Sequence, residues 1–100
     1  MSFKPHKQPG EQEYFAFDFE LSLDDDETIE SATWTVAVVQ GTDPSPSAML
    51  SGSPIVDGSK VSQMIIGGLS DVQYRLSCQA VTNLGQTLEL YDTLWVRTGP

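Results

Sequence analysis

Residues 69–85 read LSDVQYRLSCQAVTNLG, and this stretch decides the fold. Apolar and polar side chains alternate in it with the two-residue period of a strand that has one face on a core and the other in water. The side chains expected to face the core are those of Tyr74, Leu76, Cys78 and Ala80. Asn83, Leu84 and Gly85 supply the residues of a hairpin turn. The stretch therefore predicts an antiparallel, half-buried strand over residues 73–82, followed by a hairpin.

The same period recurs before and after this strand. In residues 14–21 it is strict and places apolar side chains on one face and acids on the other. The apolar set of this segment is Phe15, Phe17, Phe19 and Leu21. Turn-forming Gly, Pro, Asn and Asp residues separate further predicted strand segments, at 32–40, 48–50, 55–56, 60–66 and 86–97. No segment has apolar residues at helical spacing between caps, so we expect almost no helix.

Short strands separated by regular turns are typical of a sandwich of two sheets. We predict an all-β, antiparallel immunoglobulin or fibronectin type III-like sandwich of about seven strands. A chain of 100 residues folds as one domain. We expect the sandwich to span residues 11–100, and residues 1–10 to form either an edge strand or an extended arm.

The chain carries a formal net charge of -9, and nine of its fourteen carboxylates lie in the first thirty residues. Its five Lys and Arg residues are scattered, which argues against partners that are nucleic acids or anionic membranes. The acidic character has two readings. It either keeps the protein soluble or provides a docking face for a basic partner.

The sequence lacks the residues that catalysis requires. His6 is the only histidine and Cys78 the only cysteine, so a zinc site of N and S ligands cannot be closed and no internal disulfide can form. Cys78 lies on the predicted core face, where a thiol is unreactive. We expect no catalytic residue and no cofactor. The absence of an apolar run near the N-terminus argues against a signal peptide or a membrane span, and we expect synthesis in a reducing cytoplasm.

Asp24, Asp25, Asp26 and Glu27 are the only cluster with metal-ligand chemistry. Asp24 and Asp26 are weak candidates for a Ca²⁺ site, because contiguous acids lack the alternate spacing and the glycine of a calcium-binding loop. The favoured reading is a solvated turn in which Asp26 or Thr28 caps backbone donors.

The last predicted strand offers the sharpest interaction hypothesis. If its even-numbered leucines face the core, Tyr91 and Trp95 form an aromatic stripe on the outer face. Such a stripe is suited to a protein interface or to stacking on sugar rings. The alternative is a bulge near Asp92 that reverses the facing and buries Trp95.

Two further segments are candidates for contacts with a partner. Phe3 and Pro5 lie in the N-terminal segment, which is either a gripping arm or a frayed terminus. Pro44 and Pro46 stiffen the Gly41–Ser47 loop, which is either a contact loop or a plain connector.

Residues 69–85 also resemble the fibronectin type III signature, in which a leucine and a turn precede a tyrosine-led strand. The resemblance implies that the hydroxyl of Tyr74 bonds to the backbone near the preceding turn, and that Trp34 lies in the core. Leu69 is five residues before the tyrosine where six is usual, and no proline marks the turn. The match therefore indicates the fold class and not membership of the fibronectin family.

From Lys4 to Arg97 the chain resembles a group of small Ig-like virion proteins of tailed bacteriophages, the phage fiber-tail adaptor family. The resemblance rests on the order of short motifs, among them Pro9-Gly10-Glu11, Ser31 to Val36, Gly67-Gly68, Tyr74-Arg75-Leu76 and Thr82 to Gly85. It implies a non-enzymatic protein that joins or decorates parts of a virion, and we expect it to link fiber or tail components. Because a domain of this size offers only a modest contact area, we also expect several symmetric copies. A virion protein of this kind would be made in the host cytoplasm. Decoration of the capsid head and carbohydrate binding are the alternative functions.

Overall fold

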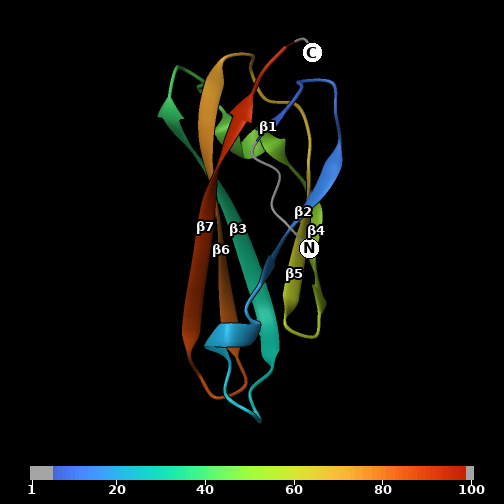
Figure 1. Ribbon diagram of the computed structural model, residues 1–100, viewed down its shortest axis with the longest axis vertical. Coiled ribbons are helices and arrows are strands. Elements are labelled where there is room, and N and C mark those ends of the chain that lie inside the picture. Colours follow the sequence, from blue (N-terminus) through green and yellow to red (C-terminus); the bar gives the residue numbers. More distant parts are fainter. Residues whose placement is uncertain (1–5, 99–100) are drawn as a thin grey trace.

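A computed structural model describes residues 6–98 of the chain (Figure 1). In this part of the chain seven strands form two sheets, of four and three strands. The strands are β1 (His6–Lys7), β2 (Glu13–Asp18), β3 (Ile29–Gln40), β4 (Leu50–Asp57), β5 (Lys60–Ile65), β6 (Val72–Thr82) and β7 (Thr87–Val96). Two short 3-10 helices, η1 (Glu20–Ser22) and η2 (Pro46–Met49), complete the described elements. None of these helices is long and apolar enough to cross a membrane.

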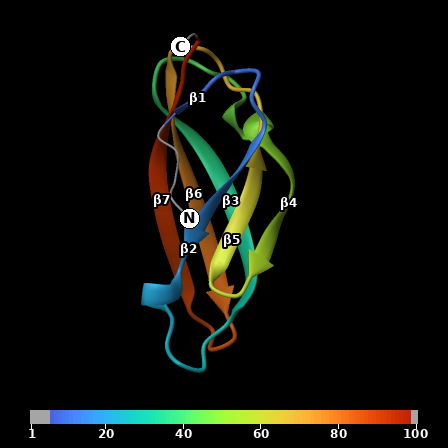
Figure 2. The same cartoon turned by 45° about the vertical axis from the view of Figure 1, so that its right-hand side comes forward.

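The two sheets pack face to face, as the two views in Figures 1 and 2 show. One sheet has the strand order β1-β7-β6-β3 and the other the order β2-β5-β4. The predicted all-β sandwich is thus confirmed. The immunoglobulin-like subclass stays a prediction, which the strand order favours. If β2 to β7 are matched with strands B to G of an immunoglobulin constant-type domain, β2-β5-β4 corresponds to B-E-D and β7-β6-β3 to G-F-C. Strand β1 departs from that scheme because it pairs in parallel with the end of β7.

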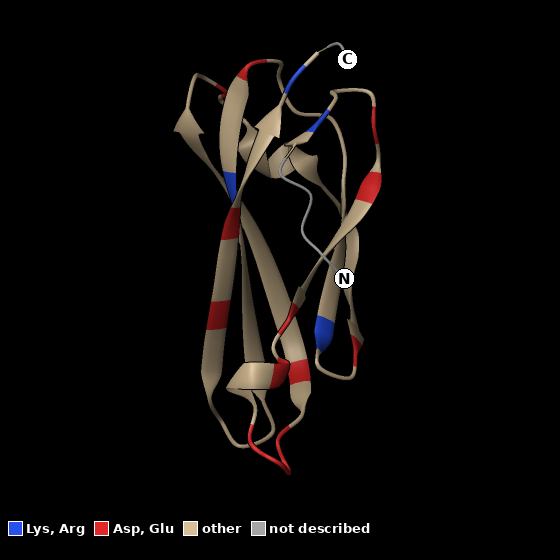
Figure 3. Cartoon of the chain, in the orientation of Figure 1, with Lys and Arg blue, Asp and Glu red and all other residues tan. Residues whose placement is uncertain are grey.

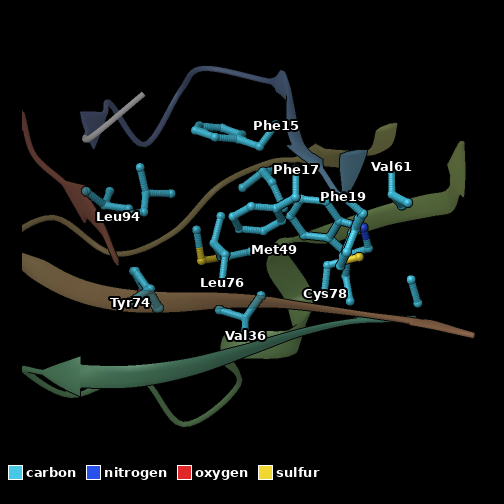
Figure 4. Packing of buried hydrophobic residues seen from close by; sticks show 14 of the residues in the cluster. Phe15, Phe17, Phe19, Val36, Met49, Val61, Tyr74, Leu76, Cys78 and Leu94 are labelled. Carbon is cyan, nitrogen blue, oxygen red and sulfur yellow. The ribbon is translucent and has the colours of Figure 1, made fainter. Parts of the chain in front are cut away.

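The core lies between the sheets and is rich in aromatic side chains (Figure 4). Phe15, Phe17 and Phe19 enter it from one sheet, and the ring of Phe17 stacks on Trp34 of the other with centroids 5.0 Å apart. Strand β6 contributes the side chains that its period predicted, namely Tyr74, Leu76, Cys78 and Ala80, each with no exposed surface. Burying these side chains is the main driving force for folding.

The predicted strand over residues 14–21 is shorter in the structure, and Leu21 is fully exposed and not in the core. The cause is a turn at Asp18. Its Oδ1 atom accepts hydrogen bonds from the amide of Glu20 at 2.9 Å and from the hydroxyl of Ser59 at 2.7 Å. These bonds lower the pKa of the Asp18 carboxyl, the Ser59 bond most. Such an Asx turn replaces the strand ladder with η1.

The other predicted strands are found with changed boundaries. Strand β3 begins at Ile29, three residues before the predicted start. Of the piece predicted at 48–50, only Leu50 lies in a strand, because Ala48 and Met49 belong to η2. The piece predicted at 55–56 lies within β4, whose pairing with β5 shifts in register between Ser51 and Ile55. The turn predicted at Asp57-Gly58 joins β4 to β5, and Gly58 has a φ of 62° there. The hairpin at Asn83–Gly85 joins β6 to β7 as predicted.

Candidate functional site

The outer face of the β1-β7-β6-β3 sheet carries the predicted aromatic pair. Strand β7 pairs with β6 from Thr87 to Val96 without a register shift, so the alternative of a bulge near Asp92 is wrong. Leu94 and Val96 are fully buried, which places Tyr91 and Trp95 on the other face. Tyr91 is 62% exposed, and Trp95 is half-buried between Gln73 and His6.

A cation lies over the exposed tyrosine. The guanidinium carbon of Arg75 is 4.9 Å from the centre of the Tyr91 ring. In β6, Arg75 is two residues from Ser77, the cross-strand partner of Tyr91, so the side chains meet diagonally on one face. A cation within about 6 Å of an aromatic ring is attracted to the ring's negative face. This contact favours an orientation of the Tyr91 ring with one face toward the guanidinium. We call Arg75, Tyr91, Thr93 and Trp95 the aromatic face.

The surroundings of the aromatic face are almost neutral. The neighbouring outward positions on β3 and β6 are Thr33, Thr35, Ala37, Gln73, Ser77 and Gln79. Glu89 is the one carboxylate on the outward positions of β7. By contrast, acids gather at the end of the molecule that holds η1 and the loop before β3, the lower end in Figure 3. A near-neutral face in a strongly acidic chain is a part of the surface that a negatively charged neighbour can approach with little repulsion.

The acidic loop is organised by Glu27 and not by Asp26 or Thr28. Glu27 is 5% exposed, and its Oε2 atom accepts a hydrogen bond from the hydroxyl of Thr82 at 2.6 Å. Its Oε1 atom accepts one from the amide of Asp24 at 3.0 Å. Asn83 joins the same turn through its side-chain oxygen, which accepts the amide of Thr28 at 2.9 Å. The loop is thus fastened to the β6–β7 hairpin.

The weak metal candidates enter this network through backbone groups: the Asp24 amide donates to Glu27, and the Asp26 carbonyl accepts from Asn83. Asp24 and Asp26 are exposed, and residues 6–98 contain no group of three or more His, Cys, Asp or Glu side chains arranged to hold a metal ion. The sequence did not indicate the role of Glu27, because its partner Thr82 is 55 residues away.

The Gly41–Ser47 loop lies at the end of β3 and is fixed by Asp43. Asp43 accepts hydrogen bonds from the amide of Ser45 at 2.9 Å and from the hydroxyl of Tyr74 at 2.7 Å. Pro44 is exposed and Pro46 half-buried. Phe3 and Pro5, the other proposed contact residues, lie outside the described residues.

Tyr74 makes the hydroxyl-to-backbone contact that is called a tyrosine corner in sandwich domains. The amide of Leu69 donates a hydrogen bond to the hydroxyl of Tyr74 at 2.9 Å, as the fibronectin-like signature implied. Burial above all raises the pKa of the Tyr74 phenol to about 12, and the Asp43 carboxylate adds to the shift. Burial likewise raises the pKa of the Cys78 thiol to about 12. Cys78 is therefore core filling, whereas His6 is exposed on β1.

Lys7 is a buried cation that the sequence did not reveal. It is 1% exposed, and its amine donates to the carbonyls of Gln8 at 2.7 Å and Gly67 at 2.6 Å. Desolvation lowers the pKa of Lys7, while Glu11 and Glu13 oppose the shift. These bonds tie β1 to the turn after β5.

Comparison with known proteins adds the family. No curated protein and no solved structure matches the chain. One family model, described as podophage GP4 fiber-tail adaptor protein gp77, matches residues 7–96, which is nearly the whole of the chain and reaches from the second residue of β1 to the last residue of β7. The resemblance to the phage fiber-tail adaptor group is thereby confirmed: the chain belongs to the podophage GP4 fiber-tail adaptor protein gp77 family.

Proposed function

We propose that this protein links fiber or tail components of a podophage virion through protein contacts made by the aromatic face. Membership of an adaptor family supports a structural, tail-associated role. The single observation that supports this face is the exposed Tyr91 ring, held under Arg75 on a near-neutral surface. Tyrosine and arginine are enriched among residues that dominate binding energies.

We further propose that the protein acts in several symmetric copies and performs no catalysis. A domain of this size offers a contact of roughly 600–1,000 Å² to each partner, which is modest for a permanent joint. Repeated copies around a symmetric tail would raise the overall strength without new contacts. The buried Cys78 thiol and the exposed His6 lie in different environments, so the chain offers no paired nucleophile and base from these two residues.

The placement is tested by locating the protein in intact particles. We expect electron microscopy of purified virions to show density for the domain at the junction of tail and fiber, with the symmetry of that junction. Density on the capsid head, or particles that lack the protein, would contradict the proposal. A blank glycan array together with tail density would exclude the carbohydrate-binding alternative. A carbohydrate site would gain from a third aromatic side chain beside Tyr91 and Trp95, but the exposed Tyr14 lies on the other sheet.

A further inference from the structure

Strand β7 has an edge that is paired only at one end. Strand β1 covers it at Trp95 and Val96, and the amide of Arg97 donates to the carbonyl of Lys7 at 2.9 Å. In the part of the chain that the structure describes, only β1 and β6 pair with β7. Within residues 6–98, the edge of this sheet is therefore open from Thr87 to Leu94.

The direction of each backbone group on β7 follows from two printed hydrogen bonds. Val96 turns its carbonyl toward β6, where it accepts the amide of Asp71, and Arg97 turns its amide toward β1. Backbone groups alternate in direction along a strand, so even-numbered residues bond toward β6 and odd-numbered residues face the open edge. The amides and carbonyls of Glu89 and Tyr91 are thus available to another strand.

This edge is also less protected than the edges of β3 and β4. The pairing of β3 shifts at two places, and β4 has a register shift and contains Gly52 and Pro54. Strand β7 has no proline, no glycine and no bulge. Natural proteins usually block a long, regular edge, because its unpaired groups are a template for another strand.

Asp92 provides the one visible block. Its Oδ1 atom accepts a hydrogen bond from the amide of Thr93 at 2.8 Å, which occupies the open-edge donor next to the region covered by β1. Asp92 is exposed and lies on the inward-facing side of β7, in line with the half-buried Leu88 and Leu90. The edge therefore presents two apolar positions and then a negative charge.

We propose that the edge of β7 from Thr87 to Thr93 takes up an extended segment of a partner chain as an added strand. The segment carries apolar side chains beside Leu88 and Leu90 and a Lys or Arg beside Asp92. Main-chain hydrogen bonds supply the affinity in this mode of recognition, and alternate side chains supply the specificity. The biological meaning rests on the proposed adaptor function, whereas the capacity of the edge to bind a strand can be measured separately.

The experiment uses the isotopically labelled full chain and a synthetic peptide, acetyl-Thr-Lys-Thr-Val-Thr-Val-Thr-amide. At millimolar peptide we expect slower amide hydrogen exchange at Glu89 and Tyr91 and no change at Leu88 and Leu90, because the amides of Leu88 and Leu90 already bond to β6. A matched peptide with Glu in place of Lys should bind several-fold more weakly, as expected for one exposed ion pair. Asp92→Asn should remove the difference between the two peptides.

A pair of variants separates the backbone from the side chain. Glu89→Pro removes an edge amide without removing a bond to β6, and should abolish the protection of Tyr91. Glu89→Ala keeps that amide and should bind the peptide as the unchanged protein does. If Glu89→Pro does not fold, strand addition is still tested in the unchanged protein, where the amides of Glu89 and Tyr91 should be protected by the peptide and those of Leu88 and Leu90 should not change.

Three results would overturn the inference. The first is an absence of protection at the amides of Glu89 and Tyr91. The second is a response confined to the side chains of the aromatic face, with no change in amide exchange along β7. The third is protection that grows with protein concentration without peptide, which would identify a second copy as the occupant. If virions show tail density but the β7 edge does not bind the peptide, the proposed adaptor function is retained and only this inference is rejected.

Discussion

The hydroxyl of Tyr74 donates a hydrogen bond of 2.7 Å to the carboxylate of Asp43, 31 residues earlier in the chain. The same hydroxyl accepts the amide of Leu69 at 2.9 Å. One phenol thus joins the corner that precedes β6 to the loop that follows β3. Because Asp43 also accepts the amide of Ser45, the proline-containing loop is fixed at its first turn.

Tyr74→Phe should destabilise the fold by about 1–3 kcal/mol, because it leaves the Leu69 amide and the Asp43 carboxylate without this partner. Denaturant unfolding followed by tryptophan fluorescence measures the change. Asp43→Ala in the Tyr74→Phe background should cost less than in the unchanged protein, with a coupling of about 0.5–3 kcal/mol. Strict additivity would show that the hydrogen bond contributes nothing to stability.

The titration of Tyr74 predicts a loss of stability at alkaline pH. Its pKa is raised from 10.0 in the unfolded chain to about 12 in the fold, so the fold favours the neutral phenol. The contribution is complete below pH 10 and declines as the pH rises toward about 12. The stability of the unchanged protein relative to Tyr74→Phe should therefore fall through this window. A difference that stays constant with pH would contradict the raised pKa.

The strands of the sandwich could be predicted because they depend on local patterns. Strand β6 alternates without a break, and every predicted core residue on it is buried. The face of Tyr91 also followed from the period, once the structure excluded a bulge. In each case the information lies within a few residues of the chain.

What could not be predicted depends on distant partners. Nothing in the sequence near Glu27 indicates that its carboxylate will accept a hydrogen bond from Thr82. Likewise, nothing near Lys7 indicates that its amine will donate to the carbonyl of Gly67. The exposure of Leu21 has a similar origin, since the turn at Asp18 is completed by Ser59, 41 residues later. Side-chain bonds that cross the sandwich form only after the strands are assembled, so a period along the sequence does not report them.

Gly68 packs too closely for a side chain. A Cβ atom there would lie 2.8 Å from Val96 and 3.1 Å from Met49, and its φ is 93°. Gly68→Ala should cost about 1–3 kcal/mol more than Gly67→Ala, because overpacking adds to the backbone strain. Gly67 is the matched control, since its φ is 61° and no atom lies within 4 Å of the added Cβ. Thermal unfolding of both variants tests the difference, and equal costs would contradict the packing argument.

Calcium should bind weakly or not at all at the acidic loop. The inward carboxylate, Glu27, is engaged by Thr82 and by the amide of Asp24, while Asp24 and Asp26 are exposed. Titration calorimetry with millimolar Ca²⁺ should release no heat above dilution. Saturable heat that disappears in the Asp24→Asn, Asp26→Asn double variant would establish a site and contradict this prediction.

Tyr91 should matter for assembly more than for folding. Because Tyr91 is exposed, Tyr91→Ala should lower the free energy of unfolding by less than about 1 kcal/mol, and this figure includes the lost contact with Arg75. An interface anchor contributes about 2 kcal/mol or more, which is roughly thirtyfold in affinity for each contact. We therefore expect Tyr91→Ala to be depleted in purified virions, measured by mass spectrometry against the capsid protein. Tyr14→Ala is the matched control, because Tyr14 is 53% exposed on the other sheet. Equal incorporation of both variants would show that the aromatic face is not the contact, while depletion of Tyr14→Ala alone would move the contact to the β2-β5-β4 sheet.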